Sequence, residues 1–340
     1  MINSILGFAW AFLISVFAIP SIINVAHLKQ LLDEPNLRTV HMSLTPRLGG
    51  IAIFAGFTSA LTIFGYFDKE IQQIIAGCIV LFFVGIKDDI VSVSPFKKFF
   101  VQVLATGIVI FIGDIRITSF QGFLGFYELP MGLSYAFTAL VIIGITNAIN
   151  LIDGLDGLAG SLTVLVCSVF GFYFYFSGVS GSSSYVDIAF CLVGGVVGFL
   201  KYNIRKAIIF MGDTGSLVCG FIISILAIKF IEFKIVSAAP ATAVAIMIIP
   251  IVDTLRVFSI RILAGRSPFS PDKNHIHHIL KGTGLSSIKI VLVILIVNSI
   301  FIGLALSFNA TSNNFIMTIT VGLALICSII LEILKRNKHD

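Results

Sequence analysis

Residues 133–178 read LSYAFTALVIIGITNAINLIDGLDGLAGSLTVLVCSVFGFYFYFSG. Two apolar runs, at about 133–149 and 158–178, flank a polar string that is punctuated by glycine. A helix needs about 20 apolar residues, with a range of about 17–25, to cross the hydrocarbon core of a bilayer. This stretch therefore predicts two membrane-spanning helices joined by a polar, glycine-containing connection.

The composition of the whole chain extends this interpretation. The 340 residues are 57% hydrophobic and 11% charged, and their mean hydropathy is +1.06. Soluble domains carry about 25% charged residues, so a soluble fold of this length could not hide so much apolar surface. The net charge of +5 is modest and the basic residues form no dense patch, so we expect no nucleic acid as partner.

Eleven apolar runs divide the chain, and the sequence predicts an all-α, polytopic integral membrane protein with one domain over residues 1–340. The first run lacks the features of a cleaved signal peptide and is expected to be a retained helix. The third, fifth and seventh runs are short, so one of them could be re-entrant. Gly194 and Gly198 have the spacing that lets two helices approach closely. The runs cover about 2–24, 47–66, 70–86, 96–113, 133–149, 158–178, 186–201, 208–229, 236–256, 288–308 and 313–334.

The basic residues of the loops predict the orientation. With eleven spans the two termini lie on opposite sides of the membrane. Of the 22 lysines and arginines, 18 fall in one set of loops, and the other set holds only Lys69, Arg116, Lys229 and Lys234. Because cytoplasmic loops carry the excess of lysine and arginine, the N-terminus is expected outside and the C-terminus inside.

Acidic residues gather at the predicted inner ends of the helices, where carboxylates near membrane depth are costly and mark candidate functional sites. They are Asp88, Asp89, Asp153, Asp156, Asp213, Asp253 and Asp272. The pair Asp88 and Asp89 ends the third run, in the string GIKDD over residues 85–89. Two adjacent carboxylates can hold a divalent cation or take a proton from a substrate; a solvated helix end is the alternative.

A second motif occupies residues 147–160, NAINLIDGLDGLAG. Asn150, Asp153 and Asp156 recur at intervals of three and so lie roughly on one face of a helix or turn. The glycines leave the backbone open to a ligand. Oxygen ligands beside exposed backbone N–H groups suit a hard cation and a phosphate.

The third motif is FMGDTGS, residues 210–216, at the start of the eighth run. A carboxylate at a helix N-terminus is favoured by the helix dipole, so Asp213 could serve as an N-cap alone. Its position on the same predicted face as the other motifs favours a shared site.

The fourth motif is RSPFSPDKNHIHH, residues 266–278, between the ninth and tenth runs. A zinc pair is conceivable, but no cysteine or glutamate completes it. Imidazole and guanidinium groups that bind phosphate fit this basic loop better, and a solvated basic loop remains the alternative. The basic entry to the second run, residues 41–50, could attract anionic lipid head groups or merely set the topology.

The ordered set of four motifs, over about residues 41–278, resembles the polyprenyl-phosphate N-acetylhexosamine-1-phosphate transferases, which include the phospho-N-acetylmuramoyl-pentapeptide translocases. The resemblance implies transfer of sugar-1-phosphate from a UDP-sugar to undecaprenyl phosphate with release of UMP. Mg²⁺, or Mn²⁺, would neutralise the donor pyrophosphate. Direct attack is preferred to an aspartyl-phosphate intermediate.

The resemblance also implies roles for individual residues. Asp213 matches the principal metal-binding aspartate, with Asn150 and Asp153 beside it on the nucleotide and metal side. Catalytic candidates are Asp88, Asp89 and Asp156, and either member of the pair would act on the lipid phosphate. Phe210 would stack on uracil. The remaining candidates for substrate binding are Arg47, Lys97, Arg266, His275, His277 and His278.

The histidine loop favours a simple UDP-N-acetylhexosamine such as UDP-N-acetylglucosamine as donor. The pentapeptide branch has three consecutive histidines, whereas Ile276 interrupts the run here. The product would start a surface glycan, such as O-antigen or a teichoic-acid linkage unit, with the active site on the cytoplasmic face of a bacterial inner membrane. Other partners to consider are membrane lipids and a second copy of the chain.

Two other classes of protein compete with this interpretation. A transporter would place ionisable groups near the bilayer midplane and show internal repeats, but here they gather at one face and no repeat is visible. An intramembrane aspartyl protease would need a Gly-x-Gly-Asp motif, and Gly212-Asp213 lacks the first glycine.

Overall fold

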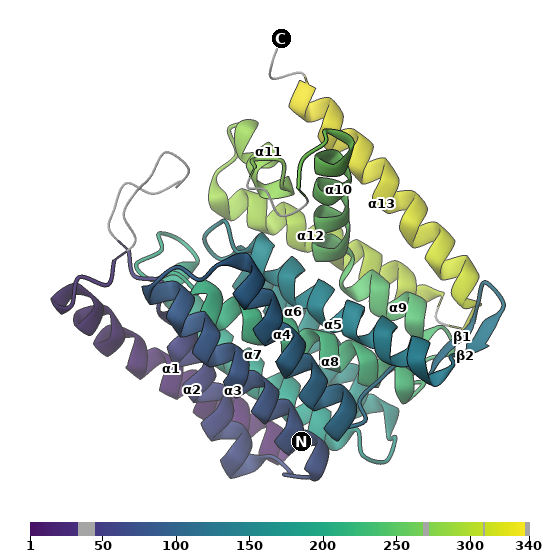
Figure 1. Ribbon diagram of the computed structural model, residues 1–340, viewed down its shortest axis with the longest axis horizontal. Coiled ribbons are helices and arrows are strands. Elements are labelled where there is room, and N and C mark those ends of the chain that lie inside the picture. Colours follow the sequence, from purple (N-terminus) through teal and green to yellow (C-terminus); the bar gives the residue numbers. More distant parts are fainter. Residues whose placement is uncertain (33–44, 268–271, 309, 337–340) are drawn as a thin grey trace. The chain divides into compact units, whose positions relative to one another are not determined.

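The computed structural model describes residues 1–32, 45–267, 272–308 and 310–336. This part of the chain is helical apart from one antiparallel hairpin of β1 (Ser119–Phe123) and β2 (Phe126–Glu128) (Figure 1). The prediction of an all-α protein is therefore confirmed apart from the hairpin. The helices are α1 (Ile2–Leu28), α2 (Gly49–Phe64), α3 (Lys69–Ile90), α4 (Pro95–Gly107) with its π-helical extension η1 (Ile108–Ile112), α5 (Met131–Ile152), α6 (Leu158–Ser177), α7 (Ser183–Asn203), α8 (Gly212–Glu232), α9 (Ala239–Ile246), α10 (Ile248–Leu263), α11 (Ile276–Gly282), α12 (Ser287–Ser307) and α13 (Asn313–Arg336).

The helices are those of a multi-pass membrane protein. In the described residues nine helices are long and apolar enough to cross a membrane, counting α4 with η1 as one. The bent pair α9 and α10 would be a tenth, and α2, with 16 residues, is shorter than the others. Each of the eleven predicted runs corresponds to one of these helices or to the bent pair.

The prediction of short third, fifth and seventh spans is wrong. The corresponding helices α3, α5 and α7 have 22, 22 and 21 residues. Each helix continues past the end of its apolar run into polar residues, such as Asp88 and Asp89 in α3 and Asn150 in α5. Polar side chains end a hydropathy signal but do not end a helix, so the runs underestimated the lengths.

The interrupted span is the ninth, which the sequence predicts as one run over 236–256. The axes of α9 and α10 differ by 76°, with the break at Met247 (Figure 1). Asn298 of α12 makes hydrogen bonds to residues on both sides of the break. Its amide donates to the Ile246 carbonyl at 3.0 Å and its oxygen accepts from Ile249 N at 3.4 Å. Pro250 follows in the first turn of α10, where its missing N–H is tolerated.

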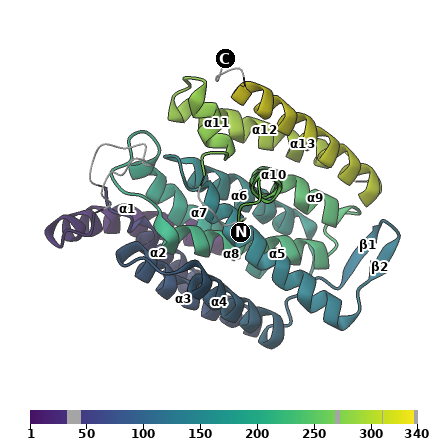
Figure 2. The ribbon, with the colours of Figure 1, turned by 45° about the horizontal axis from the view of Figure 1, so that its top comes forward.

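The chain folds into two compact units. Unit 1 comprises residues 1–118 and 130–235, and unit 2 comprises residues 119–129 and 236–340. In unit 1, α8 is buried along almost its whole length and packs against α2, α3, α5 and α6. Figures 1 and 2 both show α3 alongside α4 in this unit.

Close approach of backbones holds α8 against its neighbours. A Cβ atom on Gly85 of α3 would lie 2.5 Å from the α-carbon of Thr214, and one on Gly50 of α2 would lie 2.1 Å from Gly215 N. Only glycine allows such close approach. The predicted small-residue pair behaves likewise, since Cβ atoms on Gly194 and Gly198 of α7 would collide with α1, as expected for closely packed membrane helices.

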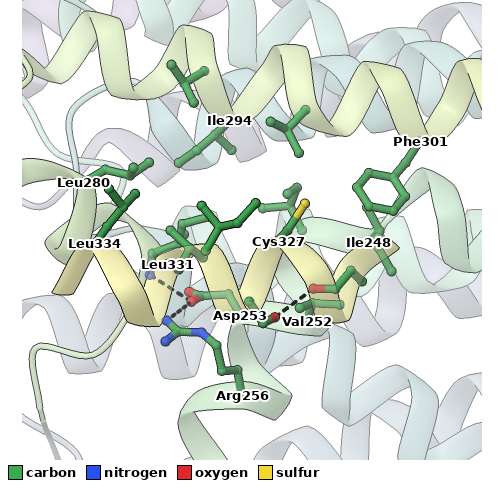
Figure 3. Close-up of a pocket in the computed structure, with 17 residues that line it drawn as sticks. Ile248, Val252, Asp253, Arg256, Leu280, Ile294, Phe301, Cys327, Leu331 and Leu334 are labelled. Atoms are coloured by element: carbon green, nitrogen blue, oxygen red, sulfur yellow. Dashed lines mark hydrogen bonds and ion pairs between the residues drawn. The ribbon is translucent and has the colours of Figure 1, made fainter. Parts of the chain in front are cut away.

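Unit 2 is built from the hairpin and from α9 to α13. Asn313 at the start of α13 donates to the Gln121 carbonyl of the hairpin at 2.9 Å and accepts from Ala241 N of α9 at 3.2 Å. An apolar cavity of about 270 Å³ is lined mainly by residues of α10, α12 and α13. Figure 3 shows Asp253 and Arg256 of α10 at one edge of this cavity, joined by a dashed line.

Candidate active site

Three helix ends in unit 1 bring Asp88, Lys98 and Asp213 together, and we call them the carboxylate–lysine cluster. Lys98 lies near the start of α4, Asp88 in the last turn of α3 and Asp213 in the first turn of α8. The Lys98 ammonium lies 2.8 Å from Asp88 Oδ2 and also pairs with Asp213 Oδ2. These side chains retain 18–24% of their exposure, so the cluster is accessible to a ligand.

The second carboxylate of the pair has a different environment. Asp89 Oδ1 accepts from Asp213 N at 2.7 Å, and Asp89 Oδ2 accepts from Thr214 N at 3.0 Å and from the Thr214 hydroxyl. Asp89 thus caps the N-terminus of α8 from another helix, where first-turn N–H groups lack partners and the dipole favours negative charge. Both of its oxygens are engaged by α8.

The chain before α8 explains how the N-terminus of this helix is held. Phe210 N donates to the Pro46 carbonyl at 2.8 Å, and Gly49 N donates to the Phe210 carbonyl at 2.9 Å. Gly212 has φ +71° and a Cβ there would lie 2.1 Å from the Arg47 carbonyl oxygen. The conformation and the space both require glycine, so the segment around Arg47 fixes the start of α8.

The second motif lies at the end of α5. The Asn150 amide donates to the Ser216 hydroxyl of α8 at 2.8 Å. Asp153 is the C-cap of α5 and is half-buried. Burial and the neighbouring carboxylates of Asp213 and Asp89 raise the pKa of Asp153 to about 7. Asn150 and Asp153 therefore lie in the electrostatic environment of the cluster.

Asp156 has a different location from Asn150. Helix α5 ends at Ile152, so the three polar residues do not share a helix face, and Asp156 lies in the turn before α6. It is buried and accepts a hydrogen bond from Ala207 N at 3.3 Å. Asn203 accepts from Gly157 N at 2.7 Å in the same turn. These bonds join the turn to the connection between α7 and α8.

The other predicted substrate residues of unit 1 differ in exposure. Phe210 is half-buried, while Arg47 and Lys97 are exposed. Lys97 is the lysine that the sequence suggested, but its neighbour Lys98, which the sequence did not single out, is the lysine that enters the cluster. Residues 97 and 98 face different sides of α4, and which of them meets the acidic partners depends on how α4 packs against α3 and α8.

In unit 2, two carboxylates fasten the segment 272–278 to α10; we call residues 272–278 the histidine segment. Asp253 Oδ2 lies 2.9 Å from His275 Nδ1, and Asp253 Oδ1 accepts from Ile276 N at 2.8 Å. Arg261 Nε donates to Asp272 Oδ2 at 2.8 Å. Burial opposes the Asp272 charge, but hydrogen bonds from Arg261 and Asn274 outweigh it and hold the pKa of Asp272 well below its usual range.

The three histidines differ in burial. His275 and His277 are buried and His278 is half-buried, while Arg266 is exposed. Burial, together with His278, lowers the pKa of His277 to about 3, so this ring is neutral. Neither ring nitrogen of His277 has a hydrogen-bond partner within the described residues. A buried polar group without a partner is costly, which marks His277 as able to bind a ligand.

The grouping of potential metal ligands bears on zinc and on magnesium in different ways. No three His, Cys, Asp or Glu side chains within 1–32, 45–267, 272–308 and 310–336 are grouped to hold a metal ion. In this part of the chain the histidines thus form no zinc site. Mg²⁺ differs from zinc because it commonly binds through one or two carboxylates, with phosphate oxygens and water as further ligands.

Comparison with known proteins agrees with this arrangement. Residues 71–231, which contain the carboxylate–lysine cluster, match the model described as glycosyl transferase family 4. A probable undecaprenyl-phosphate N-acetylglucosaminyl 1-phosphate transferase of Bacillus subtilis (strain 168) is 34% identical over 88% of this chain and 84% of its own length. Undecaprenyl-phosphate alpha-N-acetylglucosaminyl 1-phosphate transferases of Salmonella typhi and Escherichia coli (strain K12) are 30% and 29% identical, over 87% and 81% of this chain and 82% and 77% of their own lengths. The chain belongs to glycosyl transferase family 4, the polyprenyl-phosphate N-acetylhexosamine-1-phosphate transferases.

Proposed function

We propose that this protein transfers N-acetylglucosamine-1-phosphate from UDP-N-acetylglucosamine to undecaprenyl phosphate, giving undecaprenyl-diphospho-N-acetylglucosamine and UMP. The observation that carries the proposal is the meeting of Asp88, Lys98 and Asp213 at three helix ends. The names of the relatives support the donor sugar and the lipid acceptor.

The chemistry of the reaction suits such a cluster. An oxygen of the acceptor phosphate attacks the phosphorus that bears the sugar, and UMP leaves. Both reactants are anions, so positive charge must bring them together and stabilise the charge on the leaving group. Lys98 supplies one positive charge at the cluster.

The residues also fit a divalent cation. Asp88 and Asp213 already converge on one positive group, the Lys98 ammonium. Two carboxylates leave room for phosphate oxygens and water, which is the ligand set that Mg²⁺ commonly takes. We assign Asp213 and Asp88 as its protein ligands, with Asn150 and Asp153 nearby. When bound, the cation would neutralise the donor pyrophosphate.

The geometry supports different roles for the adjacent aspartates. Asp88 Oδ1 accepts from Val93 N at 2.6 Å and Asp88 Oδ2 pairs with Lys98, and the Asp88 side chain is 18% exposed. Asp89 is engaged through both oxygens with the N-terminus of α8. Asp88 is therefore the carboxylate that meets substrate or cation, and Asp89 holds Asp213 in place.

A transfer assay with purified protein tests this function. Radiolabelled UDP-N-acetylglucosamine and undecaprenyl phosphate should yield lipid-linked label and UMP in equal amounts. Excess chelator should abolish the transfer, and added Mg²⁺ or Mn²⁺ should restore it. Turnover of UDP-N-acetylmuramoyl-pentapeptide with indifference to UDP-N-acetylglucosamine would refute the donor assignment, and full activity in chelator would remove the metal.

The cytoplasmic location of the site is part of the proposal and rests on the distribution of basic residues. Ser180 and Ser286 are exposed positions in loops that the eleven-span topology assigns to opposite sides. In a cysteine-free background, Ser180→Cys should react with an impermeant thiol reagent in intact cells, and Ser286→Cys should react only after lysis. Equal labelling of both would reject this topology.

A further inference from the structure

Asp253 is a buried carboxylate that the sequence motifs do not explain. It lies on α10, is 5% exposed, and does not belong to the carboxylate–lysine cluster. Two atoms of the histidine segment contact it directly: His275 Nδ1 at 2.9 Å and Ile276 N at 2.8 Å. A third contact comes from Arg256 Nη2, 3.3 Å from Asp253 Oδ1.

The contacts of Asp253 form a clamp around the start of α11. Ile276 is the first residue of α11 and its N–H has no partner within that helix. Arg256, one turn along α10 from Asp253, also donates to the Asn274 carbonyl. Figure 3 shows the Asp253 carboxylate turned toward Arg256. One helical turn of α10 thus binds three consecutive residues, 274–276.

The contact with His275 also fixes the chemistry of the ring. An ionised carboxylate can only accept a hydrogen bond, so the hydrogen must be on Nδ1 of His275. The second nitrogen, Nε2, is then directed away from Asp253. Such a pairing is a common way for a protein to select the tautomer and orientation of an imidazole.

The ring of His275 in turn contacts the rest of the histidine segment. The His275 and His277 rings are stacked, with centroids 5.9 Å apart and an interplanar angle of 11°. The His277 and His278 centroids are 4.3 Å apart. A change in the orientation of His275 is therefore transmitted to the ring whose nitrogens have no partner in the described residues.

We propose that Asp253 is a positioning residue that orients His275, and through it His277, for binding the phosphates or sugar of the nucleotide-sugar donor. This inference rests on the proposed function, together with the role in donor binding that the family resemblance implies for these histidines. Asp253 itself touches no substrate; it acts through the ring that it holds.

The first test is the tautomer, measured by ¹⁵N NMR of histidine-labelled protein in nanodiscs. Wild-type His275 should carry hydrogen on Nδ1. Asp253→Asn should move hydrogen to Nε2, because its amide can donate to Nδ1. Asp272→Asn, which removes the carboxylate that pairs with Arg261, should leave the His275 signals unchanged. A wild-type His275 protonated on Nε2 alone would overturn the proposal even if a variant fails to fold.

The second test is a double-mutant cycle on affinity for UDP-N-acetylglucosamine, measured by calorimetry. Asp253→Asn and His275→Ala should each weaken binding about tenfold or more, the factor expected when a hydrogen bond to a charged group is lost. The double variant should be no weaker than His275→Ala, because the two residues act as one unit. Fully additive losses would overturn the proposal, as would unchanged affinity in Asp253→Asn. Wild-type protein that fails to bind this nucleotide sugar would refute the proposed function instead, while the NMR result still decides the positioning role.

Discussion

The carboxylate–lysine cluster of unit 1 and the histidine segment of unit 2 use carboxylates in opposite ways. In the cluster, Asp88 and Asp213 stay partly exposed and share one lysine. At the histidine segment, the side chains of Asp253, on α10, and Asp272 are 4% and 11% exposed and make their contacts within the protein, while the imidazole of His277 has no partner among the described residues. The carboxylates of the cluster are accessible to a ligand. Those at the histidine segment instead hold the segment, whose imidazoles could bind a ligand.

An acidic residue at a helix end is therefore not by itself evidence of a catalytic or ligand-binding role. Asp88 and Asp89 are neighbours with the same side chain, yet Asp89 resembles Asp253 in function: each caps the N-terminus of another helix. What separates reacting from anchoring carboxylates is the source of their hydrogen bonds. First-turn N–H donors of another helix hold Asp89 and Asp253, whereas a side-chain ammonium group joins the two carboxylates of the cluster.

The largest effect is expected from Lys98→Ala. Without the ammonium, Asp88 and Asp213 would repel each other and an anionic donor would meet uncompensated negative charge. Loss of a preorganised charged group at a reacting centre costs about 10²–10³ in rate, so kcat should fall at least about a hundredfold in the transfer assay.

Lys97→Ala is the matched comparison, because Lys97 is the exposed neighbour on the same helix. Its loss should be less than about threefold, in line with the modest contribution of exposed charges. Equal losses in the two variants would show that both lysines act through general surface charge and would break the distinction between the cluster and its surroundings.

The second prediction separates Asp89 from Asp88. Asp89→Asn should lower the free energy of unfolding by about 3 kcal/mol, because an amide cannot accept from the N-terminus of α8 at both positions. Asp88→Asn should change stability by less than about 1 kcal/mol and reduce kcat instead. Thermal melts of purified protein, set beside the transfer assay, measure both quantities. The anchoring role of Asp89 would be contradicted if Asp88→Asn lowered stability and Asp89→Asn lowered only kcat.

The third prediction tests the close packing of α3 against α8, which holds the residues of the cluster in place. Gly85→Ala places a Cβ 2.5 Å from the α-carbon of Thr214 and must separate α3 from α8. Overpacking of this kind costs about 1–3 kcal/mol, so we expect a loss of about 2 kcal/mol with reduced turnover. Gly144→Ala on α5 is the control, since a Cβ there meets nothing within 4 Å. It should be neutral or slightly stabilising in the same melts.

The smallest effect is expected at the histidine segment. The pKa of Asp272 is lower in the folded state than in the unfolded state. Its ion pair therefore stabilises the folded state at pH values above the usual carboxylate pKa, about 3.9. This contribution is lost as the pH falls through the pKa of the folded state. Asp272→Asn should therefore lower stability by about 1.5 kcal/mol at pH 7. The difference from wild type should shrink at pH 4 and below. A difference that does not depend on pH would show that the Arg261 contact contributes by packing alone.

Much of this architecture could be predicted from the sequence because hydropathy reports membrane helices directly. All eleven apolar runs have a helical counterpart, and Asp213 lies in the first turn of α8 as expected. The bend between α9 and α10 could not be predicted, since it depends on Asn298, 52 residues away from the Ile246 carbonyl. A hydropathy profile contains no information about such a cap.

The site was predicted less completely for a related reason. Lys98 and Asp213 are 115 residues apart, and Asp89 is 124 residues from the N–H group that it caps. Choosing between Lys97 and Lys98, or between Asp88 and Asp89, needs the packing of α3, α4 and α8. Asp272 is 11 residues from Arg261 and Asp253 is 22 residues from His275. One acidic side chain in a basic loop and another in an apolar run gave no sign of which groups they would hold.

The glycine positions packed against α8 have a consequence for how the protein can change over time. Side chains that meet side chains can exchange rotamers and absorb a substitution, whereas backbone against backbone leaves nothing to rearrange. In a saturation library, positions 50, 85 and 215 should accept almost no replacement. Many apolar residues of α13 are exposed to the surroundings and should drift freely among hydrophobic types. Mutational robustness is thus lowest beside the cluster, and adaptation to a new donor sugar is more readily reached through the loops than through the helices that carry the aspartates.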